Sequence, residues 1–497
     1  MIGIPLDGKS FPGVSLMTIA SSKGKWAEQE FSNVDLGDLR LNKRLIQIAE
    51  SFSESPESPI NQACETWAGA KAAYRFFQNE NVSAESILKS HVQNVAGRIK
   101  KENLVLVAQD TSYFLYSSHP SVQGMGRVNG FKSKSTSKTL KTSGIVMHTA
   151  FAMTSDGLPL GLLYQKIFTR DDSVETTYNS QLSGHNSQIP IEEKESFKWL
   201  EALEESHKYR TESTRMVTIC DREADIYDLF YRADELGASL LVRAKTDRYL
   251  GIPTRSKKNP SERLWESVGR QKSAGTWEVD IPVKDNEDKR TAILTVRFAA
   301  VQLYPTRHHP NYQKLEPPLT QLYAVYVKEE NPPLTVKEPL EWMLLTNIPV
   351  HSYDEAIEKV KWYCLRWRIE TFHKILKSGF KVEDCRLGTA DRLIRYLGVM
   401  SVIAWRMFWI TLVNRSSPEQ PCNSVLSEEE WRALYAKINH TKIPPSEIPS
   451  LGRAIRWIAQ LGGFLGRKGD GDPGIITLWR GWKRLADLAD GWSYATA

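Results

Sequence analysis

The sequence predicts a mixed α/β protein in which a strand-containing centre lies between two helical regions. Between about residues 96 and 245, short apolar runs rich in Val and Leu alternate with helical periodicity. From about 246 to 340 the segments are strand-like and their loops are charged and rich in Pro, which indicates a β-rich insertion. Residues 25–95 and the chain beyond about 390 have the pattern of packed helices.

The composition is that of a multidomain globular protein. The chain has 497 residues, 41% hydrophobic and 25% charged, so whole-chain disorder and a collagen-like architecture are excluded. Its five cysteines form no C-x-x-C pair, which argues against a zinc ribbon, and their odd number fits a reducing cytoplasm. The net charge of +6 is too small to establish nucleic-acid binding by itself.

Basic side chains share faces of the predicted N-terminal helices, which follow a leader at residues 1–24. The i, i+3, i+4 spacing brings such side chains together on a helix. The two basic faces comprise Arg40, Lys43 and Arg44 and, separately, Lys71 and Arg75. Either they are solvated side chains of a small helical bundle, or they belong to a DNA-binding module. Acidic residues balance the basic ones here, so composition does not decide.

Two predicted buried strands each end in an aspartate. Residues 104–109 (LVLVAQ) precede Asp110, and residues 216–220 (MVTIC) precede Asp221. Between them, residues 144–168 read as a hairpin with Asp-Gly in the turn. Acids at the C-terminal ends of neighbouring strands face one edge of an open α/β sheet, where such sheets bind ligands. Helices are also expected at 190–208 and 223–236, and strands at 238–245 and 341–350.

A long helix is predicted at residues 353–378, with polar side chains along one face. At about 100° per residue, Tyr363, Arg366, Glu370 and Lys377 fall within a sector of about 60°, opposite the apolar side chains. The face is either solvated and paired within the helix, or it brings a third carboxylate, that of Glu370, to the two strand-end aspartates.

Three carboxylates held together favour divalent-metal chemistry on phosphodiesters. Their mutual repulsion has to be neutralised, and Mg²⁺ prefers oxygen ligands while leaving positions for water and phosphate. Two such ions about 3.5–4 Å apart suit an in-line phosphoryl transfer. A glycosidase also uses paired carboxylates but has no need of a basic row. The spacing Glu370-x-x-His373 matches half of a di-iron site, but the sequence holds no second copy.

A stretch without acids separates the first aspartate from the hairpin turn. Residues 111–155 contain no Asp or Glu and carry basic residues among Gly and Ser. They are either a solvated loop or a loop that contacts phosphate, and charge alone does not decide. The basic residues are Arg127, Lys132, Lys134, Lys138 and Lys141.

One apolar segment has the length of a membrane span. Residues 396–413 read YLGVMSVIAWRMFWITLV, with Arg406 near the middle. A central arginine costs roughly 2.5–3.5 kcal/mol on insertion into a bilayer. We therefore expect a buried helix or a subunit contact.

The polar row of the long helix resembles the signature of a known family. Its spacing is Tyr363-x2-Arg366-x3-Glu370-x6-Lys377. This resembles the Y-(2)-R-(3)-E-(6)-K signature of the bacterial DDE transposases of the insertion-sequence-four family. The strings WRIETFHKILKSG, CDREADIYDLF and QDTSYFLY, which surround the three carboxylates, resemble the hairpin-forming, cut-and-paste members of that family.

The resemblance extends from about residue 25 to the end of the chain. It implies an RNase H-like catalytic core at 96–390, interrupted by the β-rich insertion at about 246–340. It also implies a helical domain at 25–95 that binds transposon ends, as residues 33–87 resemble that domain of the family. A helical dimerisation domain is implied at 391–497, where residues 451–492 resemble the family's dimer helices.

The resemblance assigns Asp110, Asp221 and Glu370 as catalytic, metal-binding residues. The implied cofactor is Mg²⁺, with two ions at the site and Mn²⁺ able to substitute. The implied chemistry is a nick that exposes a 3′-OH, hairpin formation on the transposon end, hairpin opening by water, and strand transfer to target DNA.

The same resemblance implies a set of DNA contacts. Trp342 matches the family's tryptophan that stacks on a flipped base, a contact worth about 1–3 kcal/mol; from the residues alone the preferred interpretation is a core tryptophan on a strand. Tyr363 and Arg366 would hold the neighbouring phosphate. The remaining implied contacts are Lys374 and Lys377 along the backbone, Arg243 and Trp367 near the DNA end, and the N-terminal basic faces.

The implied partners are double-stranded DNA, as transposon ends and target, and a second copy of the chain in a DNA-bridged synaptic complex. No membrane is expected, and the implied location is the bacterial cytoplasm, at the nucleoid when DNA is bound. Two other functions stay open: a transposase-derived DNA-binding protein that no longer cuts, and a structure-specific nuclease on an RNase H-like core.

Overall fold

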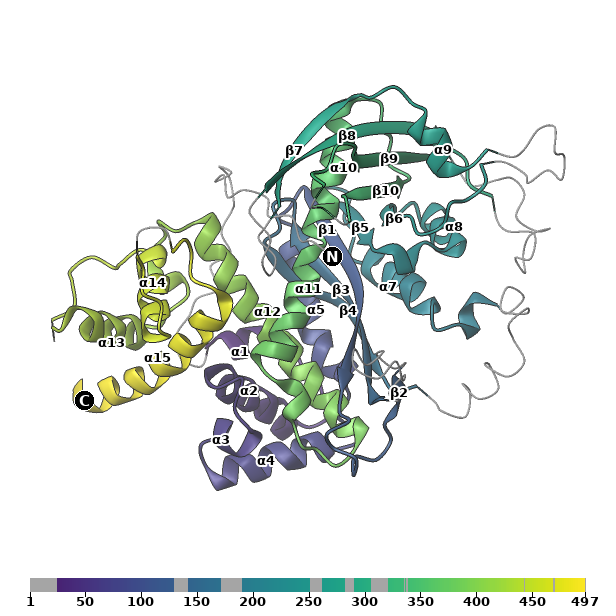
Figure 1. Ribbon diagram of the computed structural model, residues 1–497. Helices are drawn as coiled ribbons and strands as arrows, with labels where there is room; N and C mark the ends of the chain where they lie inside the picture. The colour runs from purple at the N-terminus through teal and green to yellow at the C-terminus, as the bar shows by residue number, and fades with distance from the viewer. Residues whose placement is uncertain are drawn as a thin grey trace.

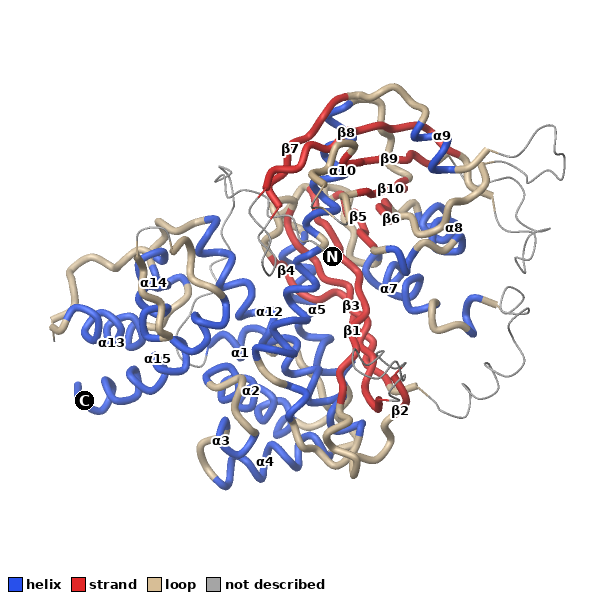
Figure 2. The backbone as a smooth tube through the Cα atoms, in the orientation of Figure 1, coloured by secondary structure: helices blue, strands red, loops and turns tan. Residues whose placement is uncertain are grey.

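One mixed β-sheet runs through the computed structural model, with helices packed on it and extending beyond it (Figure 1). Figure 2 shows the strands as a continuous band, while the last helices of the chain gather away from it. The structure describes residues 25–128, 142–170, 190–250, 262–281, 290–304, 321–334, 336, 338–441, 443–467 and 470–496. The predicted leader at 1–24 and the four lysines of the acid-free stretch lie outside these residues.

Five helices form the N-terminal region, as its sequence predicts. Three of them begin at residues whose side chains accept a hydrogen bond from a backbone N–H of the first turn, namely Asp38, Thr66 and Ser83. The buried face of the second helix includes Leu45, Ile48 and Phe52. The helices are α1 (Lys25–Glu30), α2 (Leu39–Glu54), α3 (Ile60–Ala63), α4 (Trp67–Gln78) and α5 (Ala84–Ile99).

The described part of the sheet has ten strands in the order β2-β3-β1-β5-β6-β10-β9-β8-β7, with β4 paired to β3. The β1–β5 and β5–β6 pairs are parallel, and the other pairs are antiparallel. The strands are β1 (Leu104–Leu115), β2 (Gly126–Val128), β3 (Thr142–Thr154), β4 (Pro159–Phe168), β5 (Arg215–Cys220), β6 (Ser239–Arg243), β7 (Gly275–Ile281), β8 (Arg290–Val301), β9 (Leu322–Glu329) and β10 (Glu341–Thr346).

The predicted hairpin is confirmed as β3 and β4. Its turn contains Asp156 and Gly157, and Gly157 has φ +88°, a conformation that favours glycine. Beyond the hairpin come η1 (Ile191–Glu193), α7 (Phe197–His207), η2 (Arg222–Ala224), α8 (Tyr227–Leu236) and α9 (Leu264–Gly269). The helix predicted from residue 223 therefore begins only at Tyr227.

The first predicted strand is longer than expected, and this corrects the placement of Asp110. The strand continues to Leu115, so Asp110 lies inside it, opposite Thr149 of β3. The parallel pairing with β5 ends earlier, at Ala108 and Ile219. Asp110 is thus past the end of the parallel pair although it is not at the end of its own strand.

The predicted β-rich insertion does not form a separate sheet. Its strands β7, β8 and β9 continue the central sheet, because β9 pairs with β10 and β10 pairs with β6. Figure 1 shows them as the far end of the same twisted layer, with α10 (Tyr353–Leu365) beside them.

The helix predicted at 353–378 is not continuous. The segment divides into α10, α11 (Trp367–Lys374) and a π-helical turn, η3 (Ile375–Gly379). Between α10 and α11 the hydrogen bonds connect residues three positions apart, as in a 3₁₀-helix: Arg366 N donates to Tyr363 O and Ile369 N to Arg366 O, at 3.1 Å each. At the other end Gly379 lies against Trp479, where a Cβ atom would collide with the indole ring. The equal angular steps assumed for the polar row therefore hold only approximately.

A long apolar helix, α12 (Ala390–Ser416), joins the regions. Among the described residues it is the one helix long and apolar enough to cross a membrane, and its apolar window is wholly buried inside the protein. The predicted buried helix at 396–413 is thereby confirmed. It packs on α2, α4, α5 and β4, and on α14 (Leu451–Leu461) and α15 (Ile475–Thr496). The third C-terminal helix is α13 (Glu428–Asn439); the short turn η4 (Val382–Asp384) precedes α12, and η5 (Cys422–Ser424) follows it.

Candidate active site

The sheet brings the two aspartates to one end of its parallel strands. Asp110 lies two residues beyond Ala108, the last β1 residue paired with β5, and Asp221 follows β5 directly. Asp221 caps η2, since its Oδ1 accepts a hydrogen bond from Glu223 N at 2.8 Å. Both carboxylates are therefore fixed by the backbone of neighbouring strands.

A buried aspartate holds the loop that carries Asp221. The Oδ2 atom of Asp225 accepts hydrogen bonds from Lys245 N at 2.8 Å and Thr246 N at 3.0 Å, and Arg248 pairs with its Oδ1 at 2.6 Å. The Asp225 side chain has no exposed area. The loop after β5 is thus tied to the loop after β6.

Arg366 lies between the carboxylates. Its guanidinium is hydrogen-bonded to Glu370 one helical turn later, and its Nη1 is 3.9 Å from Asp110 Oδ1. The Arg366 side chain is 5% exposed, against 18% for Asp110 and 22% for Glu370. Nη1 is buried and has no hydrogen-bond partner in the described structure. The guanidinium therefore has a donor to spare.

All three predicted carboxyl groups interact electrostatically with Arg366. Burial would lower the pKa of Arg366, but Tyr363 and the carboxyl groups of Asp110, Glu370 and Asp221 together raise it. Burial and the charge of Asp110 raise the pKa of Asp221. Burial also raises the pKa of Glu370, against the opposing effect of Arg366. The carboxyl groups of Asp221 and Glu370 thus keep raised pKa values although the charge of Arg366 acts on both.

His373, whose spacing from Glu370 matches half of a di-iron site, lies beside Asp110. Its Nδ1 is 3.5 Å from Asp110 Oδ2, and its buried Nε2 has no partner in the part of the chain that the structure describes. The i, i+3 spacing from Glu370 could have predicted that His373 lies near the carboxylates, because this spacing places both residues on one face of α11.

A second group of predicted residues adjoins the carboxylates. The rings of Trp342, on β10, and Tyr363 meet edge to face at 5.6 Å, and the Arg366 guanidinium is 5.8 Å from the centre of the Tyr363 ring. Arg243, at the end of β6, donates to Glu341 O at 3.1 Å, and its charge opposes the rise that burial causes in the pKa of Tyr363. Trp342 is buried, at 8% exposure.

The predicted backbone-binding residues divide by exposure. Lys377 is half-buried, with its Nζ 5.4 Å from the centre of the Phe114 ring; burial lowers its pKa, while Glu383 and Asp110 oppose the shift. Lys374 and Trp367 are exposed on α11. Lys377 therefore belongs with the carboxylates, and the other two lie on the surface beside them.

The N-terminal basic residues lie on α2 and α4, away from β6 and β10 (Figure 1). Arg40, Lys43, Lys71 and Arg75 are exposed, and Arg44 is half-buried. Trp67 is 76% exposed, and the Lys71 ammonium lies 4.6 Å from the centre of its ring. The predicted basic faces thus form a solvent-facing surface that also presents an aromatic ring.

The donor set suits a hard divalent cation. Three carboxyl groups act on one another, and the raised pKa values of Asp221 and Glu370 show that negative charge is disfavoured there. Among the described residues no three His, Cys, Asp or Glu side chains are close enough to hold a metal ion as they stand. Arg366, hydrogen-bonded to Glu370, lies between them.

Comparison with protein families gives three matches along the chain. Residues 23–82 match a transposase DNA-binding domain, residues 193–405 match a transposase DDE domain, and residues 402–497 match the dimerisation domain of Tn5 transposase. The DDE match contains Asp221 and Glu370 and begins after Asp110.

The fold and these domains define a DNA transposase, in which a DDE domain of the class that cleaves DNA and transfers strands lies between DNA-binding and dimerisation domains. Its domains are those of the Tn5 type. The predicted fold class, a mixed α/β core flanked by helical domains, is confirmed. The three matched domains imply that the protein binds DNA, forms a dimer and depends on a divalent metal.

Proposed function

We propose that the protein is a cut-and-paste transposase of the insertion-sequence-four family that acts through Asp110, Asp221 and Glu370. The observation that carries this proposal is that Arg366 is hydrogen-bonded to Glu370 while its Nη1 lies 3.9 Å from Asp110 Oδ1. The carboxyl group of Asp221, which follows the neighbouring strand, also acts on the guanidinium. Residues from β1, β5 and α11 converge there, although 260 positions separate the first from the last. A fold that only bound DNA would have no use for this uncompensated charge.

The three carboxylates would hold Mg²⁺, two ions at a time, with Mn²⁺ able to substitute. When bound, such ions activate the attacking oxygen and neutralise charge on the phosphodiester. The spare donor of Arg366, together with Tyr363, would bind the phosphate next to the flipped base. Lys374 and Lys377 would follow the DNA backbone, and Arg243 and Trp367 would lie near the DNA end.

The proposed reaction has four steps at one site: a nick that exposes a 3′-OH, hairpin formation on the transposon end, hairpin opening by water and strand transfer. Trp342 would stack on a base flipped out of the hairpin. Its ring is buried against Tyr363, so this role requires DNA to displace that contact. If Trp342→Ala slows nicking and hairpin formation equally, the stacking role is wrong.

Arg40, Lys43, Arg44, Lys71 and Arg75 would bind the transposon ends. We propose domains at 25–95, 96–390 and 391–497, with the leader at 1–24 and the insertion at about 246–340. Two copies would assemble with two ends into a DNA-bridged complex in the bacterial cytoplasm.

The test is a cleavage assay on labelled duplex that carries the ends of the protein's own element with flanking DNA. Products are resolved on a denaturing gel with Mg²⁺ and then with EDTA. A metal-dependent nick followed by a hairpin is the expected result. End binding without cleavage in Mg²⁺ or Mn²⁺ would instead identify a DNA-binding descendant that no longer cuts.

A further inference from the structure

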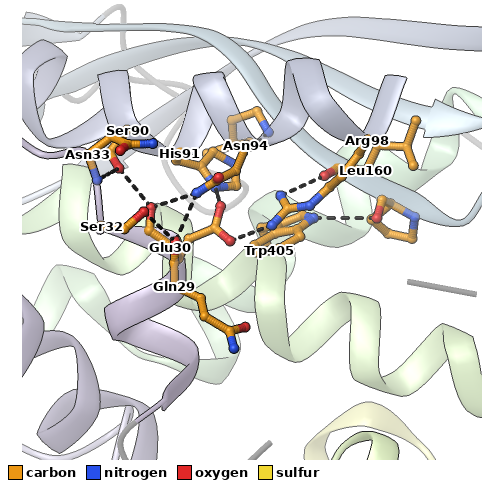
Figure 3. Close-up of polar contacts among 12 residues, drawn as sticks. Gln29, Glu30, Ser32, Asn33, Ser90, His91, Asn94, Arg98, Leu160 and Trp405 are labelled. Atoms are coloured by element: carbon orange, nitrogen blue, oxygen red, sulfur yellow. Dashed lines mark hydrogen bonds and ion pairs between the residues drawn. The ribbon is translucent and has the colours of Figure 1, made fainter. Parts of the chain in front are cut away.

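A buried polar network joins the N-terminal helices to the sheet and to α12 (Figure 3). Its centre is Glu30, the last residue of α1. Glu30 is paired with Arg98 and, at 2.5 Å, with Nδ1 of His91, both on α5. The side chains are almost wholly buried, at 5% exposure for Glu30, 0% for His91 and 10% for Arg98. No sequence pattern indicated this network.

The end of α1 is capped by side chains of α5. The Oγ of Ser90 donates to Glu30 O at 2.9 Å, and the Nδ2 of Asn94 donates to the same oxygen at 2.9 Å and to Gln29 O at 3.2 Å. The last carbonyl groups of a helix have no partners within the helix itself. Here the neighbouring helix supplies them, which fixes the end of α1 on α5.

The opposite side of the network binds the backbone of β4. In the described structure β4 pairs with β3 alone, so its other edge needs partners. Leu162 N donates to His91 Nε2 at 2.9 Å, and Arg98 donates to Leu160 O at 3.1 Å. Gly161 permits this approach, because a Cβ atom there would collide with Val95 and His91.

These contacts fix the protonation state of His91. Its Nε2 accepts from Leu162 N, so the proton is on Nδ1 and is donated to Glu30. Burial lowers the pKa of His91, in agreement with a neutral ring. The network therefore contains one negative and one positive group, each with hydrogen-bond partners.

The helix α12 closes the network. The Trp405 ring lies 4.3 Å from the Arg98 guanidinium and 4.8 Å from the His91 ring, and its Nε1 donates to Pro159 O at 3.4 Å. The next residue, Arg406, places its guanidinium 4.8 Å from the centre of the Trp26 ring on α1. Three separate parts of the chain thus meet at this point.

We propose that Glu30, His91, Arg98 and Trp405 form an interdomain joint that positions the end-binding helices relative to the catalytic carboxylates. The connection is short: α1 is held on α5, α5 on β4, β4 pairs with β3, and β3 pairs with the β1 segment that carries Asp110. The joint rests on the proposed function, because it determines where along a bound transposon end the cut falls. These are positioning residues, since none of them contacts the reacting atoms.

The test compares Glu30→Gln with Ile48→Val, a destabilising control in the core of α2 that does not touch the joint. For each variant we would measure end binding in EDTA, the melting temperature, and the distribution of nicks at nucleotide resolution. We expect the affinity of Glu30→Gln for ends to be within about twofold of the wild type. The amount of product nicked at the correct position should fall about tenfold, and nicks should appear at neighbouring positions. Ile48→Val should keep the wild-type distribution.

A second variant separates position from stability. The double change Glu30→Gln with Arg98→Met leaves no unpaired buried charge, so its melting temperature should return towards that of the wild type. It does not restore the link to Leu160 O, so the nicks should remain scattered. Recovery of the correct nick together with the melting temperature would overturn the inference, as would a Glu30→Gln distribution identical to that of Ile48→Val.

A readout without cleavage keeps the two proposals apart. The measurement is hydrogen exchange of backbone amides in the free protein. In the wild type the amides of α2 to α4 should exchange at the same rate as those of β4, and in Glu30→Gln they should exchange faster than those of β4. If the wild type does not cut its ends, the proposed function fails while this comparison still stands. If it cuts but the exchange of the two regions is unchanged by Glu30→Gln, the joint fails.

Discussion

Two buried groups in this protein use the same three kinds of side chain in opposite ways. The joint contains Glu30, Arg98 and His91, and the candidate active site contains Glu370 with Arg366 and His373. In the joint both histidine nitrogens and both ends of the ion pair have partners. In the site Arg366 Nη1 and His373 Nε2 have none among the described residues.

The difference is one of charge balance. Although burial would raise the pKa of Glu30, Arg98 and His91 lower it to about 2. At the site one arginine faces three carboxyl groups, and the pKa values of Asp221 and Glu370 are raised. A buried group that is neutral and satisfied serves structure, whereas one left with excess charge and spare donors is arranged for a partner from outside.

The largest effect should come from removing a carboxylate of the site. We expect Glu370→Ala to reduce cleavage to background and to leave end binding within about twofold of the wild type, because the proposed metal ligand would act on chemistry and not on end recognition. The measurement is the gel assay together with end binding in EDTA. Asp391→Ala removes an exposed acid and is the control. Substantial cleavage by Glu370→Ala would exclude that residue from the site.

Removing the carboxylate of the joint should instead cost stability. Glu30→Ala leaves Arg98 buried and unpaired, so we expect a loss of about 3–5 kcal/mol in the free energy of unfolding at neutral pH. The pKa of Glu30 is about 2 against an ordinary 4.5, so this stabilisation is complete above pH 4.5 and is lost as the pH falls towards 2. Denaturant unfolding at several pH values measures it. A loss equal to that of the exposed Glu80→Ala would contradict the argument.

The site should respond in the opposite direction. The pKa of Asp221 is raised by burial and by Asp110, so its charged form destabilises the fold above that pKa. Asp221→Asn keeps an acceptor for Glu223 N, and we expect it to raise stability at neutral pH by about 0.5–2 kcal/mol while abolishing cleavage. The gain should vanish as the pH falls and the wild-type aspartate protonates. A destabilised variant at neutral pH would show that Asp221 is a structural residue.

The smallest effect concerns Glu50, a half-buried carboxyl group with two other carboxyl groups, those of Glu28 and Glu54, near it. Burial, Glu28 and Glu54 raise the pKa of Glu50 to about 7. The stability that follows from its neutral form is complete below pH 4.5 and is lost as the pH rises through 7. Glu50→Gln should therefore stabilise the protein by about 1 kcal/mol at pH 8, a value discounted because the group is half-exposed, and should have little effect at pH 5. Equal melting shifts at both pH values would refute this.

Local sequence patterns predict much of the fold and several residues of the candidate site. The apolar runs before Asp110 and Asp221 and the Asp-Gly turn predict β1, β5 and the β3–β4 hairpin, because each is a property of consecutive residues. The spacing of Arg366 and Glu370 predicts one helix face, and the two side chains are hydrogen-bonded.

What the sequence did not show depends on contacts between distant segments. β1 continues past Asp110 because it pairs with β3, which no local pattern specifies. The π-helical turn lies where Gly379 packs on Trp479, 100 positions later. The joint gave no signal because Glu30 lies 61 positions from His91 and 68 from Arg98, and isolated charged residues in helices are usually solvated.

The burial of α12 has a consequence for how the chain is made. The helix is about 40 Å long and is covered by the N-terminal helices, by β4 and by the C-terminal helices. The N-terminal helices leave the ribosome first, and Trp405 follows about 300 residues later, an interval of roughly 15–60 s at ordinary synthesis rates. During that time the face of α5 that receives Trp405 has no native cover. The three domains are therefore separate in sequence but cannot finish folding one after another, because the N-terminal helices and β4 complete their packing only after α12 has been released.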